Sequence, residues 1–268
     1  MIDLNAFINT IGSELVNCSN KLVCQGINFN PEKGVFPRCL YLETDGRDLD
    51  KQGCVIIGLN PGTILDKEEG NGVGIREKNK FSSLINFKDL TLEQDRESLF
   101  QEQNKFFNED IKNNVVYYRR IKAIINFLEI KGPILWTELV KCECPKSSDG
   151  LIKSTVYNCA TKYLFKELEM VPKEWPIFAI GDETYRYLLL RESIKLIGLP
   201  HASQMYGKVI SKDSAKMDFK NLLLPEDDIK FTFSRDSKQR KLINKNRSLL
   251  KTKIITGKFP FQFPREQN

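Results

Sequence analysis

The chain has 268 residues, of which 41% are hydrophobic and 28% are charged, a balance typical of a soluble globular protein and not of a disordered chain. Its formal net charge of +6 is too small to identify a polyanionic partner by itself. No stretch approaches the roughly 18 apolar residues of a membrane span, and the N-terminus lacks the regions of a signal peptide, so we expect a cytoplasmic protein with no membrane partner.

The first third of the chain contains one predicted helix and one predicted strand. Apolar residues recur at helical spacing over 1–20, which predicts a helix. Several prolines and glycines punctuate 25–52, which we predict to be irregular. Residues 54–59 form a short apolar run that is typical of a strand buried on both faces, and Asn60-Pro61-Gly62 ends it.

Helices and strands alternate along the rest of the chain. After a polar loop over 63–80, the patterns predict mainly helix over 81–130, a helix over 155–171, a helix ending at 190, and strands over 134–137, 176–181 and 194–199. This alternation predicts an α/β fold, a three-layer α/β/α sandwich with a central, mostly parallel four-stranded sheet. Sites in such sheets lie beyond the carboxyl ends of the strands, where we expect Asn60, Glu138, Gly181 and His201.

The domain organisation follows from charge. We expect one α/β domain over 1–210 and a basic C-terminal extension over 211–268. Residues 235–258 contain nine basic residues and one acid, Asp236. This run is either a solvated charged surface or a surface that contacts DNA phosphates.

Seven cysteines are many for a chain expected in the cytoplasm. The odd number and the expected compartment disfavour a disulfide framework. They leave two interpretations, ligation of a metal or cluster and a scatter of reduced core thiols.

Three segments, in order, resemble the uracil-DNA glycosylase superfamily. Gly58-Leu59-Asn60-Pro61-Gly62 resembles its motif A, and His201-Ala202-Ser203 resembles its motif B. Between them, residues 136–142 resemble the Thr-Asn-Val-Val-Lys-Cys segment of the iron–sulfur branch. The resemblance covers roughly 18–207 and implies hydrolysis of the N-glycosidic bond of a flipped pyrimidine in DNA, which leaves an abasic site.

The resemblance also implies roles for individual residues. Asn60 matches the residue that holds the attacking water, and His201, the only histidine, matches the donor to the base O2. Met205 matches the apolar wedge that fills the gap in the helix, although simple packing is an equal alternative. The remaining residues expected to line the base site are Gly58, Leu59, Pro61, Gly62 and Ser203.

Glu138 departs from the family pattern, because uracil readers carry asparagine at this position. An ionised carboxylate only accepts hydrogen bonds, so it would repel O4 of uracil but pair with the N4 amino group of cytosine. We therefore predict a modified cytosine as substrate, for example hydroxymethylated or glucosylated at C5 as in phage DNA, and a role in defence against phage. The alternatives are a structural role for Glu138, a uracil repair enzyme, and a non-catalytic DNA-binding module.

The iron–sulfur branch holds a [4Fe–4S] cluster with four cysteines. Cys142 and Cys159 match the last two ligands, and Cys18 and Cys24 are the natural first pair. Cys39 and Cys144 are rival ligands, and Cys54 is expected in the core. Such a cluster would be structural, zinc is the alternative metal for the same thiols, and we expect a monomer.

Overall fold

The computed structural model describes residues 2–16, 18, 24–27, 29, 35–38, 40–61, 93–127, 130–144, 153–189 and 196–199. The chain divides into two compact units. The first comprises Met1–Asp45, Gly58–Val115 and Leu135–Pro172, and the second comprises Gly46–Ile57, Val116–Ile134 and Lys173–Asn268. The proposed extension over 211–268 lies outside the described residues.

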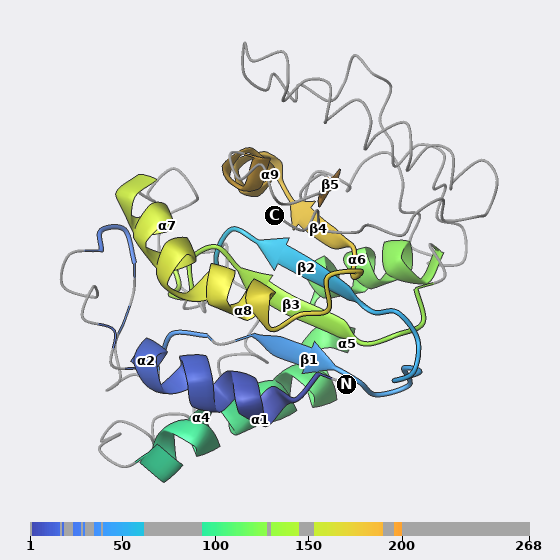
Figure 1. Ribbon diagram of the computed structural model, residues 1–268, viewed down its shortest axis with the longest axis horizontal. Helices are drawn as coiled ribbons and strands as arrows, with labels where there is room; N and C mark the ends of the chain where they lie inside the picture. Colours follow the sequence, from blue (N-terminus) through green and yellow to red (C-terminus); the bar gives the residue numbers. More distant parts are fainter. Residues whose placement is uncertain are drawn as a thin grey trace. The chain divides into compact units, whose positions relative to one another are not determined.

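The strands form a mostly parallel sheet, drawn in Figure 1, which confirms the α/β class. They are β1 (Tyr41–Glu43), β2 (Cys54–Gly58), β3 (Ile134–Glu138), β4 (Ile177–Ile180) and β5 (Leu196–Leu199). Their order is β1-β3-β2-β4-β5. The prediction of four strands is therefore wrong, because the segment over 25–52 that we expected to be irregular contributes β1.

The extra strand β1 has only three residues, fewer than the run of four to eight that periodicity detects. All three are buried. The ring of Tyr41 stacks on that of Phe107 with centroids 4.4 Å apart, and Glu43 accepts a hydrogen bond from Trp136 Nε1 at 3.2 Å. Arg38 N, before β1, donates to the carbonyl of Lys141, after β3, so β1 runs antiparallel to β3. These contacts are tertiary, which is why the local sequence pattern did not predict the strand.

The outer edge of β1 is capped by side chains from a helix. That helical segment consists of α4 (Glu93–Phe106), the π-helical η6 (Phe107–Ile111) and α5 (Lys112–Asn114). Leu42 N donates to Asn104 Oδ1 at 2.9 Å, and Leu42 O accepts from Asn108 Nδ2 at 3.1 Å. Two asparagines one helical turn apart thus satisfy the backbone groups that an edge strand leaves unpaired.

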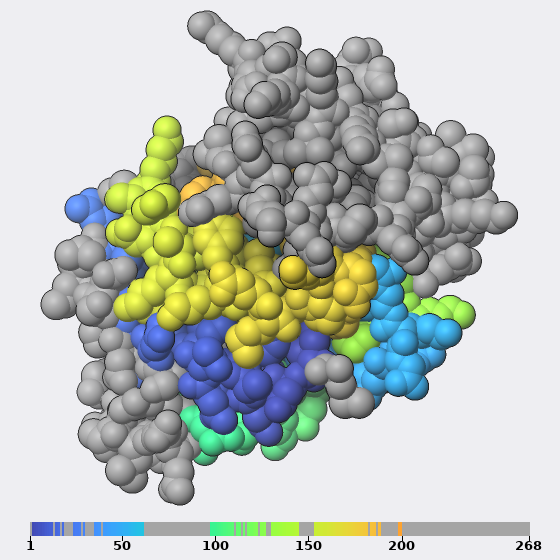
Figure 2. Space-filling view, viewed as in Figure 1, coloured from blue at the N-terminus to red at the C-terminus, as the bar shows by residue number. Residues whose placement is uncertain are grey.

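The first unit also contains the two predicted helices at 1–20 and 155–171, and both are confirmed. The N-terminal one consists of α1 (Leu4–Phe7), η1 (Ile8–Gly12) and α2 (Ser13–Val16), and the later one of α7 (Lys153–Cys159), η8 (Ala160–Leu164) and α8 (Phe165–Glu169). Gly12 lies so close to the Phe100 ring that a Cβ atom there would meet it at 2.7 Å. The Lys166 ammonium lies 2.9 Å from Glu14, and Figure 2 shows this helix (yellow) against the N-terminal one (blue).

The second unit holds β4, β5 and most of β2, which pair in parallel. Val55 of β2 pairs with Ile177 of β4, and Phe178 pairs with Ile197 of β5. Every residue of β2 and β4 is buried, as the continuous apolar runs predicted. The unit also contains α6 (Val116–Phe127) and α9 (Asp182–Leu189), and Gly181, with φ of 87°, makes the turn from β4 into α9.

No helix among the residues described above has the length and apolar character that crossing a bilayer requires.

Replacing Asn104 with alanine should lower the free energy of unfolding by about 1–2 kcal/mol, because Leu42 N loses its acceptor at a partly buried strand edge. Urea denaturation measures the change. Asn126→Ala is the control, since the bond that Asn126 accepts from Arg47 is long, at 3.4 Å, and exposed, and it should cost less than about 0.5 kcal/mol. Equal losses would contradict the capping role of Asn104.

Candidate functional site

The segment that contains Asn60 and the segment that contains Glu138 lie side by side in the first unit. Glu138 is the last residue of β3, and Asn60 follows β2 by two residues. Leu139 N donates to Gly58 O at 3.0 Å and Val140 N donates to Leu59 O at 2.9 Å. The parallel ladder therefore continues past both strands and brings the two predicted site segments to one sheet edge.

Asn60 has its side chain oriented by a neighbour. The amide nitrogen Nδ2 donates to the carbonyl of Pro61 at 2.8 Å. The residue is half-buried, whereas Pro61 is buried. This bond uses an amide hydrogen and leaves Oδ1 as an acceptor, so the side chain can accept a hydrogen bond from a water molecule or a ligand.

Glu138 is almost fully buried, with 9% of its surface exposed. Burial raises the pKa of its carboxyl to about 7, the positive charges of Lys141 and Arg38 oppose this rise, and the charge of Glu167 adds to it. Desolvation disfavours the carboxylate. At neutral pH the group therefore populates both the acid, which can donate a hydrogen bond, and the carboxylate, which cannot.

A buried ion pair supports the turn after β3. The Lys141 ammonium and the Glu167 carboxylate are both fully buried, with Nζ 2.6 Å from Oε2. Thr137 Oγ1 also donates to Glu167 Oε2 at 2.6 Å, and Lys141 Nζ contacts Thr137 Oγ1. We name Thr137, Lys141 and Glu167 the buried ion-pair cluster. The cluster has no signal in the sequence, because Glu167 lies 26 residues from Lys141 in an ordinary helical pattern.

A second buried ion pair also holds this turn. Arg38 donates from its guanidinium to Glu143 Oε1 at 2.8 Å, and both side chains are less than a tenth exposed. Arg38 N also donates to Lys141 O at 2.7 Å. The residues from Glu138 to Glu143 are thus held by two buried pairs, neither of which has a signal in the local sequence.

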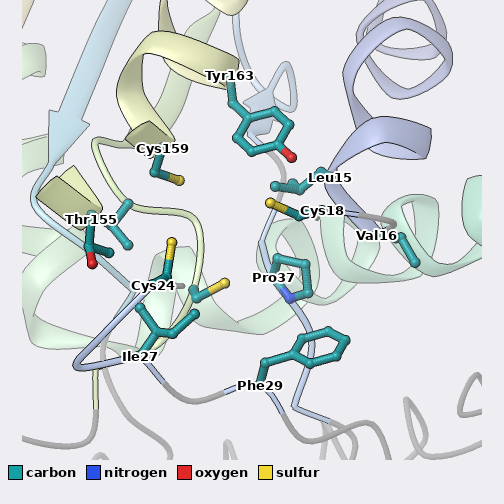
Figure 3. A pocket seen from close by; sticks show the side chains of 12 residues that line it. Leu15, Val16, Cys18, Cys24, Ile27, Phe29, Pro37, Thr155, Cys159 and Tyr163 are labelled. Carbon is teal, nitrogen blue, oxygen red and sulfur yellow. The ribbon is translucent and has the colours of Figure 1, made fainter. Parts of the chain in front are cut away.

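The four predicted cysteine ligands line one cavity in the first unit. Figure 3 shows Cys18 and Cys24 of the N-terminal segment and Cys159 of α7 around it, and Cys142, in the turn after β3, lines the same cavity. The described residues that line the cavity are Leu15, Val16, Cys18, Cys24, Ile27, Phe29, Pro37, Val140, Cys142, Thr155, Cys159 and Tyr163. Cys144 is buried but is not one of them, Cys54 lies in β2 as expected of a core residue, and Cys39 lies outside the described residues.

Two hydrogen-bonding side chains place the N-terminal cysteines at the cavity. Thr155 Oγ1, on α7, accepts from Gln25 N at 3.0 Å and donates to Gln25 O at 3.1 Å. These two bonds hold Gln25, the neighbour of Cys24, against α7. The Tyr163 hydroxyl donates to Glu14 O at 3.1 Å, near the end of the helix that precedes Cys18. Protein contacts alone therefore bring these two thiols to the helix that carries Cys159.

Burial disfavours the ionised forms of Cys142 and Cys159. Burial raises the pKa of Cys142 well above its usual range, and the neighbouring Cys159, Cys18 and Cys24 raise it further. Burial raises the pKa of Cys159 to about 12, although a hydrogen bond from Lys141 N at 3.3 Å opposes the rise. Four thiols close enough to influence one another fit the donor set of a cluster or a zinc ion.

Ligand geometry is a separate criterion from proximity. Within the described ranges, no three histidine, cysteine or acidic side chains stand in positions that could hold a metal ion. The four thiols are a suitable donor set for a cluster or a zinc ion, and metal binding by them stays a prediction.

The remaining predicted site residues, Gly62, His201, Ser203 and Met205, lie outside the described residues. Their roles stay predictions.

Comparison with known proteins adds no relative, since no protein-family model matches the chain and no curated protein matches it significantly.

Cys142→Ser should remove most of the bound metal, because it deletes one of the four thiols that line the cavity. Metal content after anaerobic purification, by elemental analysis and visible absorption, measures the loss. Cys54→Ala is the matched control, since Cys54 is a buried thiol in β2, and it should leave the metal content unchanged. Equal metal content in the two variants would contradict a site at this cavity.

Glu138 should make the protein less stable as the pH rises. The carboxyl has a pKa of about 7 in the native protein and near 4.3 in the unfolded chain, so the native state binds more protons between these values. The contribution of Glu138 to the free energy of unfolding is therefore complete below about pH 4 and is lost as the pH rises through about 7. Urea denaturation between pH 4.5 and 8 should show this fall, and Glu138→Gln should reduce it. An unchanged slope in Glu138→Gln would show that another group titrates.

Proposed function

We propose that this protein is a DNA glycosylase that hydrolyses the N-glycosidic bond of a flipped pyrimidine. The observation that carries the proposal is that the segment containing Asn60 and the segment containing Glu138 meet at one sheet edge. Bonds from Leu139 N to Gly58 O and from Val140 N to Leu59 O join them. An acceptor amide and a buried carboxyl on these two adjacent segments offer the two functions that such a reaction needs, a water-binding group and a base-reading group.

The chemistry assigns Asn60 to the water. When the bond between the base and C1′ breaks, the bonding electrons go to the base and positive charge develops on the sugar. Asn60 Oδ1 is free to accept a hydrogen bond because Nδ2 is held by Pro61 O, so it can orient a water toward C1′. The predicted role of His201 is to donate to O2 of the departing base, where negative charge collects.

Glu138 is proposed to read a cytosine-type base, with a modification at C5 as the expected substrate feature. Its carbonyl oxygen can accept from the N4 amino group, while its acid form can donate to N3, which is an acceptor in cytosine. A pKa of about 7 supplies this acid form at neutral pH. The same acid form could also accept from N3–H of uracil and donate to O4, which makes uracil repair the second candidate.

The cavity thiols are proposed to hold a structural [4Fe–4S] cluster, with zinc as the alternative. Cys18, Cys24, Cys142 and Cys159 would be the ligands, and the bound group would cross-link the N-terminal segment, the turn after β3 and α7. Hydrolysis needs no redox step, so the residues do the chemistry and the cluster supports their positions.

The wider biological setting is part of the proposal. The basic run over 235–258 is proposed to contact DNA phosphates. The proposed fold is a three-layer α/β/α sandwich. The protein is proposed to act as a cytoplasmic monomer against phage with modified genomes.

Oligonucleotides containing uracil, cytosine, 5-hydroxymethylcytosine or its glucosylated form, followed by alkaline cleavage of abasic sites, test the activity. Strand scission is expected with the modified cytosines only. Scission with uracil alone would support the repair enzyme instead. No scission with any base, together with DNA binding that is unchanged in His201→Ala, would indicate a non-catalytic module.

Glu138→Asn should shift the preference toward uracil by about 10-fold or more, since one bidentate base contact contributes about 1–3 kcal/mol of discrimination. The ratio of kcat/KM for the two bases measures the shift. Glu169→Gln, an exposed acid on α8, is the control and should leave the ratio unchanged. An unaltered ratio in Glu138→Asn would show that Glu138 does not contact the base.

A further inference from the structure

The helix that carries Cys159 has a buried face and an exposed face. The buried face lines the thiol cavity with Thr155, Cys159 and Tyr163, which follow one another at four-residue spacing. The other face is exposed to solvent, and Figure 2 shows α7 (yellow-green) on the visible surface. The exposed residues of α7 and η8 are Lys153, Ser154, Tyr157 and Thr161.

Tyr157 is the centre of this exposed face. Among the described residues, only Tyr157 and Leu49 are large hydrophobic side chains that are exposed, at 55% and 45%. A tyrosine ring at the surface offers a flat aromatic face on which a nucleic-acid base can stack. Exposed side chains contribute little to stability, so substitution of Tyr157 tests binding without unfolding the protein.

Lys153 lies one helical turn before Tyr157. Residues four apart are neighbours on a helix surface, with about 5–6 Å between their Cβ atoms. Within the described ranges Lys153 forms no ion pair, whereas Lys166, further along the same helix, lies 2.9 Å from Glu14. The helix from 153 to 164 contains two lysines and no acid. The exposed face therefore combines an aromatic ring with an unopposed positive charge.

The first two turns of α7 lie toward the same sheet edge as the proposed base site. Thr137, within β3, donates to Glu167 on α8. Further toward the carboxyl end, Lys141 N donates to Cys159, at the end of α7. Moving in this direction along the sheet therefore means moving toward the N-terminus of the helix, where residues 153–157 lie. Figure 1 shows α7 beyond the arrowhead of β3, the strand that Glu138 ends.

We propose that the exposed face of α7 binds an unstacked segment of DNA, with the Tyr157 ring stacked on a base and the Lys153 ammonium on a neighbouring phosphate. The inference rests on the proposed function in that DNA is the substrate. Flipping a nucleotide opens the duplex locally, which leaves bases beside it available for stacking. A base–aromatic contact tolerates any sequence, because every base has a π face.

The first experiment measures binding of the full chain to a fluorescein-labelled oligothymidylate by fluorescence anisotropy. Tyr157→Ala should weaken binding by about 5–100-fold, whereas Tyr157→Phe, which keeps the ring, should bind like the unsubstituted protein. Leu49→Ala is the matched control, since it removes the other exposed large side chain, and it should leave the affinity unchanged. Three results overturn the proposal: no binding by the unsubstituted chain, equal affinity in Tyr157→Ala and Leu49→Ala, or an equal loss in Tyr157→Phe and Tyr157→Ala.

The second experiment measures the same affinity as a function of salt concentration. Lys153→Gln should reduce the slope of log affinity against log salt by about 0.7, the value for one phosphate contact on a single strand. Lys166→Gln is the control on the same helix, because Lys166 is paired with Glu14, and it should leave the slope unchanged. A slope in Lys153→Gln equal to that of the control overturns the phosphate contact.

The third experiment locates the contact on the chain. Photo-cross-linking with an oligothymidylate that contains 4-thiothymidine, followed by mass spectrometry, should modify the peptide that contains Tyr157. Cross-links confined to other peptides overturn the assignment of the bound strand to α7.

Oligothymidylate contains neither uracil nor cytosine, so binding and excision are measured separately. Weakened binding in Tyr157→Ala, without strand scission of any substrate by the unsubstituted protein, would mean that the contact stands and the activity is wrong. Scission by the unsubstituted protein, with unchanged binding in Tyr157→Ala, would mean that the activity stands and the contact is wrong.

Discussion

The Nζ atom of Lys141 lies 2.6 Å from Oε2 of Glu167, and neither side chain is exposed to solvent. Thr137 Oγ1 completes the cluster by donating to the same carboxylate oxygen. Losing one partner of such a pair costs about 3–5 kcal/mol, because a buried charge is left uncompensated. The turn after β3 is therefore fixed to α8, and the positions of Glu138 and Cys142 at the two ends of this turn depend on that constraint.

The same turn carries both proposed sites, the base-reading carboxyl and the metal-binding thiols, and these would require opposite environments. Glu138 is valuable as a base reader if it keeps a proton near neutral pH, and its burial favours this. The thiols of Cys142 and Cys159 must lose their protons to bind a metal, and their burial opposes this. Lys141 N donates to Cys159 Sγ, and the charge of Lys141 lowers the pKa of both Glu138 and Cys159, against the effect of burial.

The four strands that coincide with apolar runs were predictable from the sequence, whereas the three-residue strand β1 was not. The patterns at 54–59, 134–137, 176–181 and 194–199 each became a strand, because strands buried on both faces leave a continuous apolar run. β1 has no such run. It exists because Tyr41 stacks on Phe107 and because Asn104 and Asn108 cap Leu42, and these partners are more than 60 residues away in sequence.

The sequence by itself determined the α/β class and the two segments that meet at the sheet edge, since residues that follow parallel strands share one edge by geometry. It also named four cysteines, which the structure places around one cavity. Only the tertiary structure decided the fifth strand, the pairing of Lys141 with Glu167, and that of Arg38 with Glu143. The physical reason is that periodicity reports which face of an element is buried, whereas ion pairs and pKa shifts depend on which distant side chain shares that burial.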